Sequence, residues 1–342
     1  MKKTELFQLG EFGLIDHLTK NFKINNDSTV LGIGDDCAII KESSEKEIVV
    51  TTDLLLEGIH FDFMYCPLKH LGYKAVAVNV SDIYAMNALP KQITVSIGVS
   101  AKFSIESLEQ LYSGIELACN YYGVDLVGGD TSSSLTGLVV SITAIGEAPK
   151  GKAVKRGVSK VNDLICVSGD LGAAFMGLQV LEREKHVFNE TNHISPKLEG
   201  YDYVLQRQLK PDARKDIVER LAKYNIQPTA MIDISDGLSS ELLHICKSSD
   251  CGCFIYEEKV PINEKTESVA NEFSINPLTA ALNGGEDYEL LFTINLNDFH
   301  KISMVADVTI IGKITEKNEG KKLITRQGEK VTLVAQGWNG FS

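Results

Sequence analysis

The stretch of sequence that is most informative about the fold covers residues 69–88, KHLGYKAVAVNVSDIYAMNA. Small and apolar side chains fill most of it, and we predict a helix over residues 69–87 that packs closely against a sheet. The polar segment Asn79-Val80-Ser81-Asp82 lies inside this helix. A carboxylate such as Asp82, among small and apolar neighbours, is poorly explained as a residue that is simply exposed to solvent.

Short runs of β-branched and apolar residues flank this helix and predict a sheet in the first half of the chain. Strands are predicted at 47–52, 93–99, 124–127 and 138–145, a second helix at 105–122, and an amphipathic helix at 5–22. The strand at 47–52 and the strand at 124–127 are each expected to end in an acidic motif. The second half repeats the mixture, with strands at 164–167, 290–294 and 308–311 and helices at 173–183 and 214–224.

The composition turns to glycine, lysine and proline at residues 149–157, which predicts a domain boundary. We therefore expect an α+β protein of two α/β domains, residues 1–149 and 150–342. Residues 186–200 look like a surface insertion.

The totals limit the classes of function. The formal net charge of −12 and a pI near 5.1 argue against nucleic acid as a partner, because that binding depends on clustered lysine and arginine. We find neither an apolar run long enough to cross a membrane nor a signal-peptide core. The seven cysteines form no framework, and the lone pair Cys251 and Cys253 is more simply explained as packed thiols than as a metal site. A cytoplasmic protein with reduced thiols is expected.

Acidic residues recur in six short motifs, several of them beside glycine. The motifs are Gly34-Asp35-Asp36, Thr51-Thr52-Asp53, Asn79-Val80-Ser81-Asp82, Gly128-Gly129-Asp130-Thr131, Asp233-Ile234-Ser235-Asp236-Gly237 and Asn283-Gly284-Gly285-Glu286-Asp287. Any one of them alone could be a turn or a helix cap. Together they favour a metal–phosphate site, because clustered carboxylates repel one another unless a cation lies between them, and magnesium prefers oxygen ligands.

Two other glycine-containing segments imitate nucleotide motifs. Residues 146–153 nearly match a P-loop, but Ala153 stands where the magnesium-binding serine or threonine belongs, so a connecting loop is the better interpretation. Residues 32–37 begin like a dinucleotide fingerprint, but Asp35 and Asp36 would repel a pyrophosphate and Cys37 replaces the third glycine.

Taken in order, the acidic motifs resemble the thiamine-monophosphate kinase family, within the superfamily that includes aminoimidazole ribonucleotide synthetase and selenophosphate synthetase. The resemblance runs from Leu9-Gly10-Glu11-Phe12 to Gly337-Trp338. It implies ATP-dependent phosphorylation of thiamine monophosphate to thiamine diphosphate with several Mg²⁺ ions. It also implies a homodimer in which the strands of the N-terminal domains form a shared barrel, and a C-terminal domain with a mixed sheet covered by helices.

The resemblance also implies roles for individual residues. The magnesium ligands would be Asp35, Thr51, Thr52, Asp53, Asp82, Asp130, Asp233 and Asp236. ATP would contact Tyr112, Gly129, Asp130, Arg156 and Ser235, and thiamine monophosphate would contact His60, Glu286 and Trp338. Asp53, Asp130, Asp236 and Arg156 would carry the catalysis.

Elementary chemistry fits these roles. Phosphoryl transfer depends mainly on positioning and charge neutralisation, so direct in-line transfer without a phosphoenzyme is expected. Trp338, the only tryptophan, could stack on the cationic thiazolium, although a tryptophan that covers an apolar edge is the simpler alternative. Taken alone, His60 could be a buried structural histidine, Tyr112 a core residue and Glu286 part of a turn.

Two positions depart from the family pattern, namely Cys37 after the acidic pair and Asn339-Gly340-Phe341 after Trp338. Two alternatives to the kinase remain. One is another ATP-dependent synthetase of the same superfamily, and the other is a non-catalytic regulator that binds nucleotide or thiamine.

Overall fold

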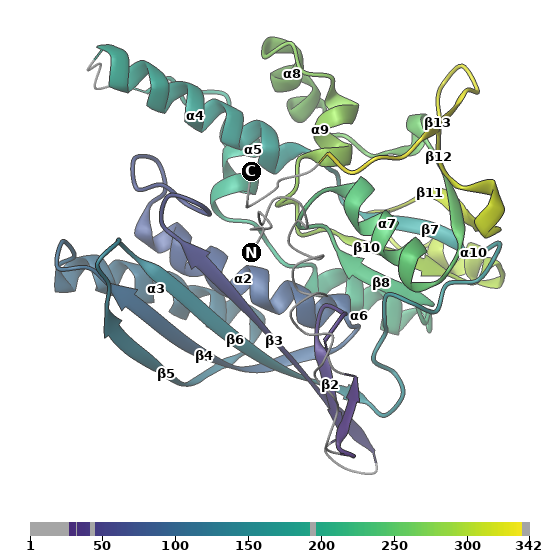
Figure 1. The fold of residues 1–342 in the computed structure, drawn as a ribbon, viewed down its shortest axis with the longest axis horizontal. Helices are drawn as coiled ribbons and strands as arrows, with labels where there is room; N and C mark the ends of the chain where they lie inside the picture. Colours follow the sequence, from purple (N-terminus) through teal and green to yellow (C-terminus); the bar gives the residue numbers. More distant parts are fainter. Residues whose placement is uncertain (1–26, 32, 42–44, 192–195, 337–342) are drawn as a thin grey trace, which may run out of the picture.

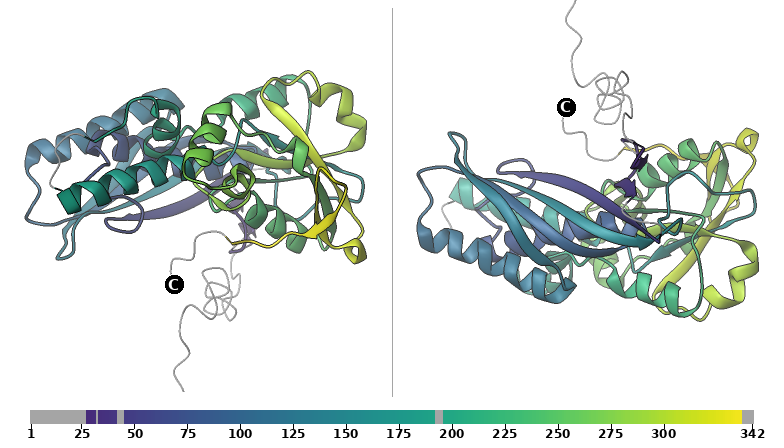
Figure 2. Two further views of the ribbon diagram at one scale, coloured as in Figure 1. Left: turned by 90° about the horizontal axis from the view of Figure 1, so that it is seen from above. Right: turned by 90° about the horizontal axis from the view of Figure 1, so that it is seen from below.

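The structure is a computed structural model that describes residues 27–31, 33–41, 45–191 and 196–336. Two sheets and the helices around them form two lobes that lie side by side (Figure 1, Figure 2). The predicted helix at 5–22, Gly32, Trp338 and the residues that follow it lie outside the described residues. No helix within the described residues is long and apolar enough to cross a membrane.

The first sheet has the strand order β1-β2-β3-β6-β4-β5. Its strands are β1 (Thr29–Leu31), β2 (Ala38–Lys41), β3 (Lys46–Leu56), β4 (Leu89–Val99), β5 (Asp125–Ser133) and β6 (Val139–Pro149). Among the described strands of this sheet, only the β4–β5 pair is parallel. β5 is the last strand of the sheet in this order, and each of its residues is exposed.

Two of the acidic motifs lie inside strands and not at their ends. β3 continues through Asp53 to Leu56, and β5 continues through Asp130 to Ser133. The prediction that both motifs end their strands is therefore wrong. Ladder pairing explains the difference, because β6 pairs with β3 as far as Leu56, and β4 pairs with β5 as far as Ser133.

Helices α2 (Leu68–Ala85) and α3 (Ile105–Tyr122) lie behind the strands of the first sheet in the view of Figure 1. They cross at their glycines: a Cβ on Gly72 would lie 2.0 Å from the Leu111 carbonyl oxygen, and a Cβ on Gly114 would lie 2.0 Å from the Lys69 carbonyl oxygen. The small residues therefore do allow close packing, but against a second helix as well as against the sheet.

The second sheet has the order β13-β12-β9-β11-β7-β10-β8 and is mixed, since β9 and β12 run parallel. Its strands are β7 (Leu164–Ser168), β8 (Ala230–Asp233), β9 (Gly252–Tyr256), β10 (Leu290–Ile294), β11 (Val308–Thr315), β12 (Lys321–Ile324) and β13 (Lys330–Thr332). The surrounding helices are α4 (Ala173–Thr191), α5 (Asp202–Leu209), α6 (Lys215–Lys223), α7 (Leu238–Ser248), α8 (Glu264–Glu272), α9 (Pro277–Asn283) and α10 (Phe299–Ile302). Since α4 runs to Thr191, the first part of the expected insertion at 186–200 is helical.

Alternation along β8 gives the second sheet two buried faces. Met231 belongs to the same core cluster as α2 and the first sheet, whereas Ala230 and Ile232 belong to a cluster that includes residues of α7 and α9. Because side chains alternate along a strand, Asp233 points to the same side as Met231, toward α2. Residues 146–153 are the end of β6 and a turn, as expected of a connecting loop.

Candidate active site

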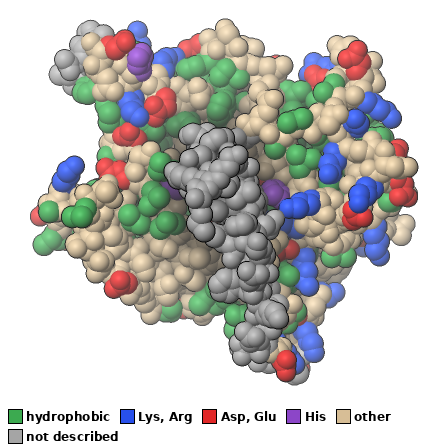
Figure 3. All heavy atoms as spheres, in the orientation of Figure 1, with side chains coloured by type: hydrophobic (Ala, Val, Ile, Leu, Met, Phe, Trp, Pro, Cys, Tyr) green, Lys and Arg blue, Asp and Glu red, His purple; other side chains and the backbone are tan. Residues whose placement is uncertain are grey.

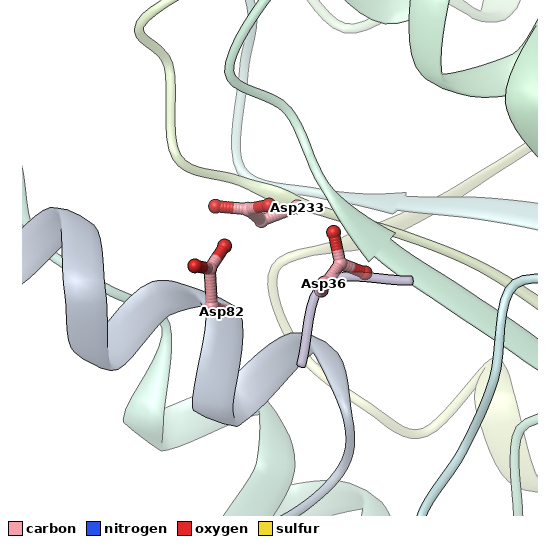
Figure 4. Close-up of side chains that lie close together, drawn as sticks. All are labelled: Asp36, Asp82 and Asp233. Carbon is pink, nitrogen blue, oxygen red and sulfur yellow. The ribbon is translucent and has the colours of Figure 1, made fainter. Parts of the chain in front are cut away.

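Three carboxylates from distant parts of the sequence converge between the two lobes. Asp36 precedes β2, Asp82 lies on α2 and Asp233 ends β8, and one oxygen of each lies within 4.8 Å of the others. Figure 4 shows the three side chains pointing toward a common space. Oxygen ligands at this spacing suit a hard divalent cation such as Mg²⁺.

Hydroxyl groups orient two of these carboxylates. Thr51 Oγ1 donates to Asp82 Oδ2 at 2.5 Å, and Ser81 Oγ donates to Asp233 Oδ2 at 2.6 Å. Asp53 lies two residues after Thr51 on β3, so the two side chains share a face of the strand. The Thr-Thr-Asp motif therefore brings one hydroxyl and one carboxylate to the face that α2 covers.

The cluster is unfavourable as three bare anions. Burial raises the pKa of Asp36 to about 7 and that of Asp233 to about 6, and it raises the pKa of Asp82 well above its usual range. The neighbouring carboxylates act in the same direction. Among the described residues, the buried Asp36 Oδ2 has no hydrogen-bond donor. A cation among these oxygens would meet that need, so the site fits a divalent metal.

Arg156 contacts both members of the acidic pair Asp35 and Asp36. Its guanidinium hydrogen-bonds Asp36, and its backbone N–H donates to Asp35 Oδ2 at 3.1 Å. Asp35 also accepts the backbone N–H of Asp36 at 3.0 Å. The structure therefore places Asp36 in the carboxylate cluster, and Asp35 beside it against Arg156. The sequence prediction had selected Asp35.

A cavity of about 280 Å³ extends from the carboxylates between α2, β3 and the second lobe. Its lining includes seven of the predicted site residues, namely Asp53, His60, Asp82, Asp233, Ser235, Asp236 and Glu286. Five of the six acidic motifs, each separate in the sequence, thus meet at this cavity or at the carboxylate cluster beside it.

His60 and Glu286 line this cavity, and its lining also includes the aromatic side chains of Tyr65, Phe175 and Tyr288. His60 Nδ1 accepts the Leu56 backbone N–H at 3.1 Å, which leaves the proton of the neutral ring on Nε2. Burial lowers the pKa of His60, so the ring is neutral near pH 7.

The loop before β10 adopts an unusual backbone that presents Glu286 to the cavity. Glu286 and Tyr288 have φ angles of 57° and 51°, and the Glu286 N–H donates to the Ser235 carbonyl at 2.6 Å. Gly285 precedes them at a φ of 72°. These left-handed conformations are uncommon outside glycine and often occur at functional sites.

Three predicted nucleotide contacts lie elsewhere in the same chain. Tyr112, Gly129 and Asp130 line a second hollow over β5. Asp130 shares a row of the first sheet with Leu54, through the pairs Leu54–Ser141, Ser141–Ser96 and Ser96–Asp130. Three strand spacings separate the two ends of that row, or roughly 14 Å.

The faces of the sheet differ as well. Paired residues point to the same face, so Asp130 shares the face of Leu54, opposite to that of Asp53. Thr52 also lies on that face: its hydroxyl donates to the Ile142 carbonyl at 3.0 Å. Within one chain the structure brings neither Asp130 nor the Thr52 hydroxyl to the carboxylate cluster.

Some residues at the site had not been selected from the sequence. The predicted magnesium ligands include Asp35 but not its neighbour Asp36. Lys74 and Gln208 contact Glu286 and are not among the predicted residues, because neither belongs to a sequence motif. For Lys74 a signal exists in the sequence. Lys74, Val78 and Asp82 follow one another at intervals of four residues, which places all three on one face of the predicted helix.

Comparison with known proteins defines the class first. The model of the AIR synthase related protein N-terminal domain matches residues 34–148, which cover the first sheet from the Asp35-Asp36 pair onward together with α2 and α3. The chain is therefore similar, over this lobe, to the AIR synthase related proteins.

Full-length relatives are more specific. The thiamine-monophosphate kinase of Bacillus subtilis (strain 168) is 33% identical over 97% of this chain and 100% of its own length. That of Aquifex aeolicus (strain VF5) is 36% identical over 98% of this chain and 99% of its own. A structure of AaThiL complexed with AMPPCP and TMP aligns with a TM-score of 0.81 at 33% identity, covering 99% of each chain. The chain belongs to the thiamine-monophosphate kinase family.

Proposed function

We propose that this protein transfers the γ-phosphoryl group of ATP to thiamine monophosphate and releases thiamine diphosphate and ADP. The observation that carries the proposal is the single cavity that joins the Asp36, Asp82 and Asp233 cluster to His60 and Glu286. The carboxylate end suits metal-bound phosphates, and the other end suits a heterocyclic ring.

The chemistry needs little more than placement. An acceptor phosphate has a second pKa of about 6 and is ionised at neutral pH, so a general base is not required. Direct in-line attack on the γ-phosphorus follows, with catalysis by positioning and charge neutralisation. His60, neutral and with its proton on Nε2, can donate a hydrogen bond to the acceptor without adding charge.

Asp36, Asp82 and Asp233 would hold Mg²⁺, with Asp53, Asp236, Asp35 and the Thr51 hydroxyl as further oxygen donors nearby. When bound, Mg²⁺ supplies charge neutralisation between the two phosphate groups. Arg156, which forms an ion pair with Asp36, would contact the ATP phosphates as a planar fork. Ser235 lines the same cavity and is a proposed ATP contact.

The predicted residues on β5 suggest that the complete site needs two copies of the chain. β5 is a fully exposed terminal strand, and the sheet face that carries Asp130 also bears the exposed Leu54. In Figure 3 that part of the molecule shows few charged side chains compared with the second lobe. We propose a homodimer in which the first sheets pair into a barrel, and in which the Tyr112, Gly129 and Asp130 hollow of one protomer joins the carboxylate cluster of its partner.

Complementation tests that arrangement. Asp130→Asn and Asp233→Asn, each inactive alone, would be unfolded together and refolded as a mixture. If the site is shared, mixed dimers contain one intact site each, and activity returns to about one quarter of the wild-type value. A mixture that stays inactive, while co-purification of two differently tagged protomers shows that mixed dimers form, would place all of these residues in one protomer's site.

The kinase itself is tested with purified protein, ATP, Mg²⁺ and thiamine monophosphate. Thiamine diphosphate and ADP should appear in equal amounts, and both should disappear with EDTA. ADP without thiamine diphosphate would point to another acceptor within the superfamily. ATP binding without turnover would point to a regulator.

Each of the two sheets belongs to a domain with its own proposed role. We propose that residues 1–149 form the ATP- and magnesium-binding dimerisation domain, and that residues 150–342 supply Asp233, Asp236, Glu286 and, in the C-terminal segment, Trp338. All seven cysteines are free thiols, which supports a reducing, cytoplasmic location.

A further inference from the structure

One face of helix α2 runs along the cavity. Lys74, Val78 and Asp82 are spaced four residues apart, so they form one stripe that is about 12 Å long from the first to the last. Asp82 belongs to the carboxylate cluster, and Val78 lines the cavity. Lys74 lies at the end where Glu286 and His60 are found. The stripe therefore has a carboxylate at one end and an ammonium group at the other.

Lys74 is a buried cation with defined partners. Its side chain is 3% exposed, and Nζ lies 2.8 Å from Glu286 Oε1. Nζ also donates to the Gln208 backbone carbonyl at 3.2 Å. A lysine is seldom buried without a purpose, because removing an ammonium group from water is costly unless it is paired. Here the pairing fixes a carboxylate that lines the cavity.

Gln208 completes the arrangement from α5. Its Nε2 donates to the second carboxylate oxygen, Glu286 Oε2, at 2.7 Å. Since a carboxylate only accepts, this contact requires the amide nitrogen to face Glu286 and fixes the orientation of the amide. The Gln208 Oε1 atom is then buried and has no hydrogen-bond donor among the described residues, so it is Glu286 that sets the orientation of the amide. The Glu286 carboxylate lines the cavity and can only accept, so it favours a ligand that brings an N–H group.

We propose that Lys74 is a positioning residue for the acceptor. Together with Gln208, it holds the Glu286 carboxylate so that this end of the cavity selects a ring that carries an exocyclic amino group as a donor, as an aminopyrimidine does. The inference rests on the proposed function, since it assigns the ring end of the same acceptor site. Lys74 acts through Glu286 and contacts no reacting atom.

Alternative roles for Lys74 predict different results. A lysine that only stabilises the fold would change unfolding without changing the choice of acceptor. A lysine that contacted a substrate phosphate itself would act independently of Glu286. A positioning lysine loses its effect once Glu286 can no longer carry a charge. These three cases are separable by steady-state kinetics on the full-length enzyme.

The experiment compares Lys74→Met with Lys69→Met, which removes an exposed lysine from the same helix. Each enzyme is assayed with thiamine monophosphate and with its 4-oxo analogue, in which the ring amino group is replaced by a carbonyl. We expect Lys74→Met to raise the KM for thiamine monophosphate about tenfold, the size of a lost charge-assisted hydrogen bond. The value of kcat and the KM for ATP should stay within about twofold of wild type. The preference for the amino ring over the oxo ring should fall, and Lys69→Met should match wild type.

A double-mutant cycle with Glu286→Gln gives the decisive comparison. In the Glu286→Gln background, Lys74→Met should add little to the rise in KM, because the two residues act as one unit. Additive effects, an equal rise in the KM for ATP, or an unchanged KM for thiamine monophosphate would each overturn the proposal. If Lys74→Met does not fold, Gln208→Met removes the amide from the same carboxylate and must produce the same loss of ring discrimination. Failure of the wild-type enzyme to make thiamine diphosphate would instead reject the proposed function itself.

Discussion

The Ser81 hydroxyl on α2 donates a 2.6 Å hydrogen bond to the Asp233 carboxylate at the end of β8. This contact joins the helix of the first lobe to the second sheet at the carboxylate cluster. Both groups are buried, with exposures of 0% and 3%. The bond therefore orients a proposed metal ligand and also marks where the two lobes meet.

Ser81→Ala should weaken metal binding more than it weakens the fold. Without the hydroxyl, Asp233 keeps its charge but loses the donor that orients it. Loss of such a supporting contact typically costs about 10–100-fold in metal affinity. The Mg²⁺ concentration for half-maximal activity should rise by that order, with kcat at saturating Mg²⁺ nearly preserved. Ser303→Ala, which removes a hydroxyl at the end of α10, is the control and should leave the Mg²⁺ requirement unchanged.

Asp82→Asn should separate stability from activity. The substitution keeps the volume and removes a buried charge whose pKa is raised by burial and by Asp53 and Asp233. At pH 8 without metal, the variant should gain about 1–3 kcal/mol in the free energy of unfolding. An aspartate of raised pKa must either stay ionised in the buried cluster or take up a proton on folding, and asparagine avoids both costs. Activity should fall by at least about 100-fold. Urea unfolding in EDTA measures the first effect, and Asp250→Asn at an exposed position is the control. A less stable variant would mean that Asp82 is favourably paired in the metal-free protein.

The metal-free protein should become less stable as the pH rises through neutrality. The pKa values of Asp36 and Asp233 are raised to about 7 and about 6 in the folded protein, above roughly 4 for an unfolded aspartate. In the window between these values the folded state binds more protons than the unfolded state, so the free energy of unfolding falls with increasing pH. Mg²⁺ competes with those protons and should restore stability more strongly at about pH 8 than at about pH 6. Thermal melts with EDTA and with Mg²⁺ at both pH values test this. Equal stabilisation by Mg²⁺ at both would contradict it.

Gly114→Ala should disrupt the crossing of α2 and α3. Its Cβ would lie 2.0 Å from the Lys69 carbonyl oxygen and 2.9 Å from the Tyr73 nitrogen, both of them backbone atoms. The helices must separate, and overpacking of this kind costs about 1–3 kcal/mol. Gly98→Ala is the control, because its nearest contact would be 3.4 Å from the Val139 side chain. Urea midpoints of the two variants give the comparison, and equal midpoints would show that the crossing can relax.

Several elements could be predicted from periodicity alone. The helix at 105–122 and the strand at 290–294 have the predicted bounds, because Gly123 ends the former in a left-handed conformation and the latter is a fully buried run of apolar residues with the β-branched Thr293. Longer elements were underestimated, since β3 and β5 carry polar residues that only ladder pairing keeps in the strand.

The candidate site was predictable as a set of acidic motifs and less so residue by residue. Asp35 and Asp36 are adjacent, and which of them joins Asp82 and Asp233 depends on Arg156, about 120 positions away. The position of Asp130 depends on a strand register that motif order does not contain. Lys74 and Gln208 belong to no motif, and only the folded chain brings them to Glu286.

The burial of α2 has a consequence for how the molecule comes apart. One continuous hydrophobic core includes residues of the first sheet, of α2 and α6, and one face of the second sheet. Because the two lobes share this core, they cannot rotate apart around a hinge without exposing it to water. They should melt together in a single cooperative transition, and a cut in the connection near residue 155 should release no separately folded half. Two large anionic substrates must then enter through movement of the loops at the opening of the cavity, while the α2 residues that line it keep their positions.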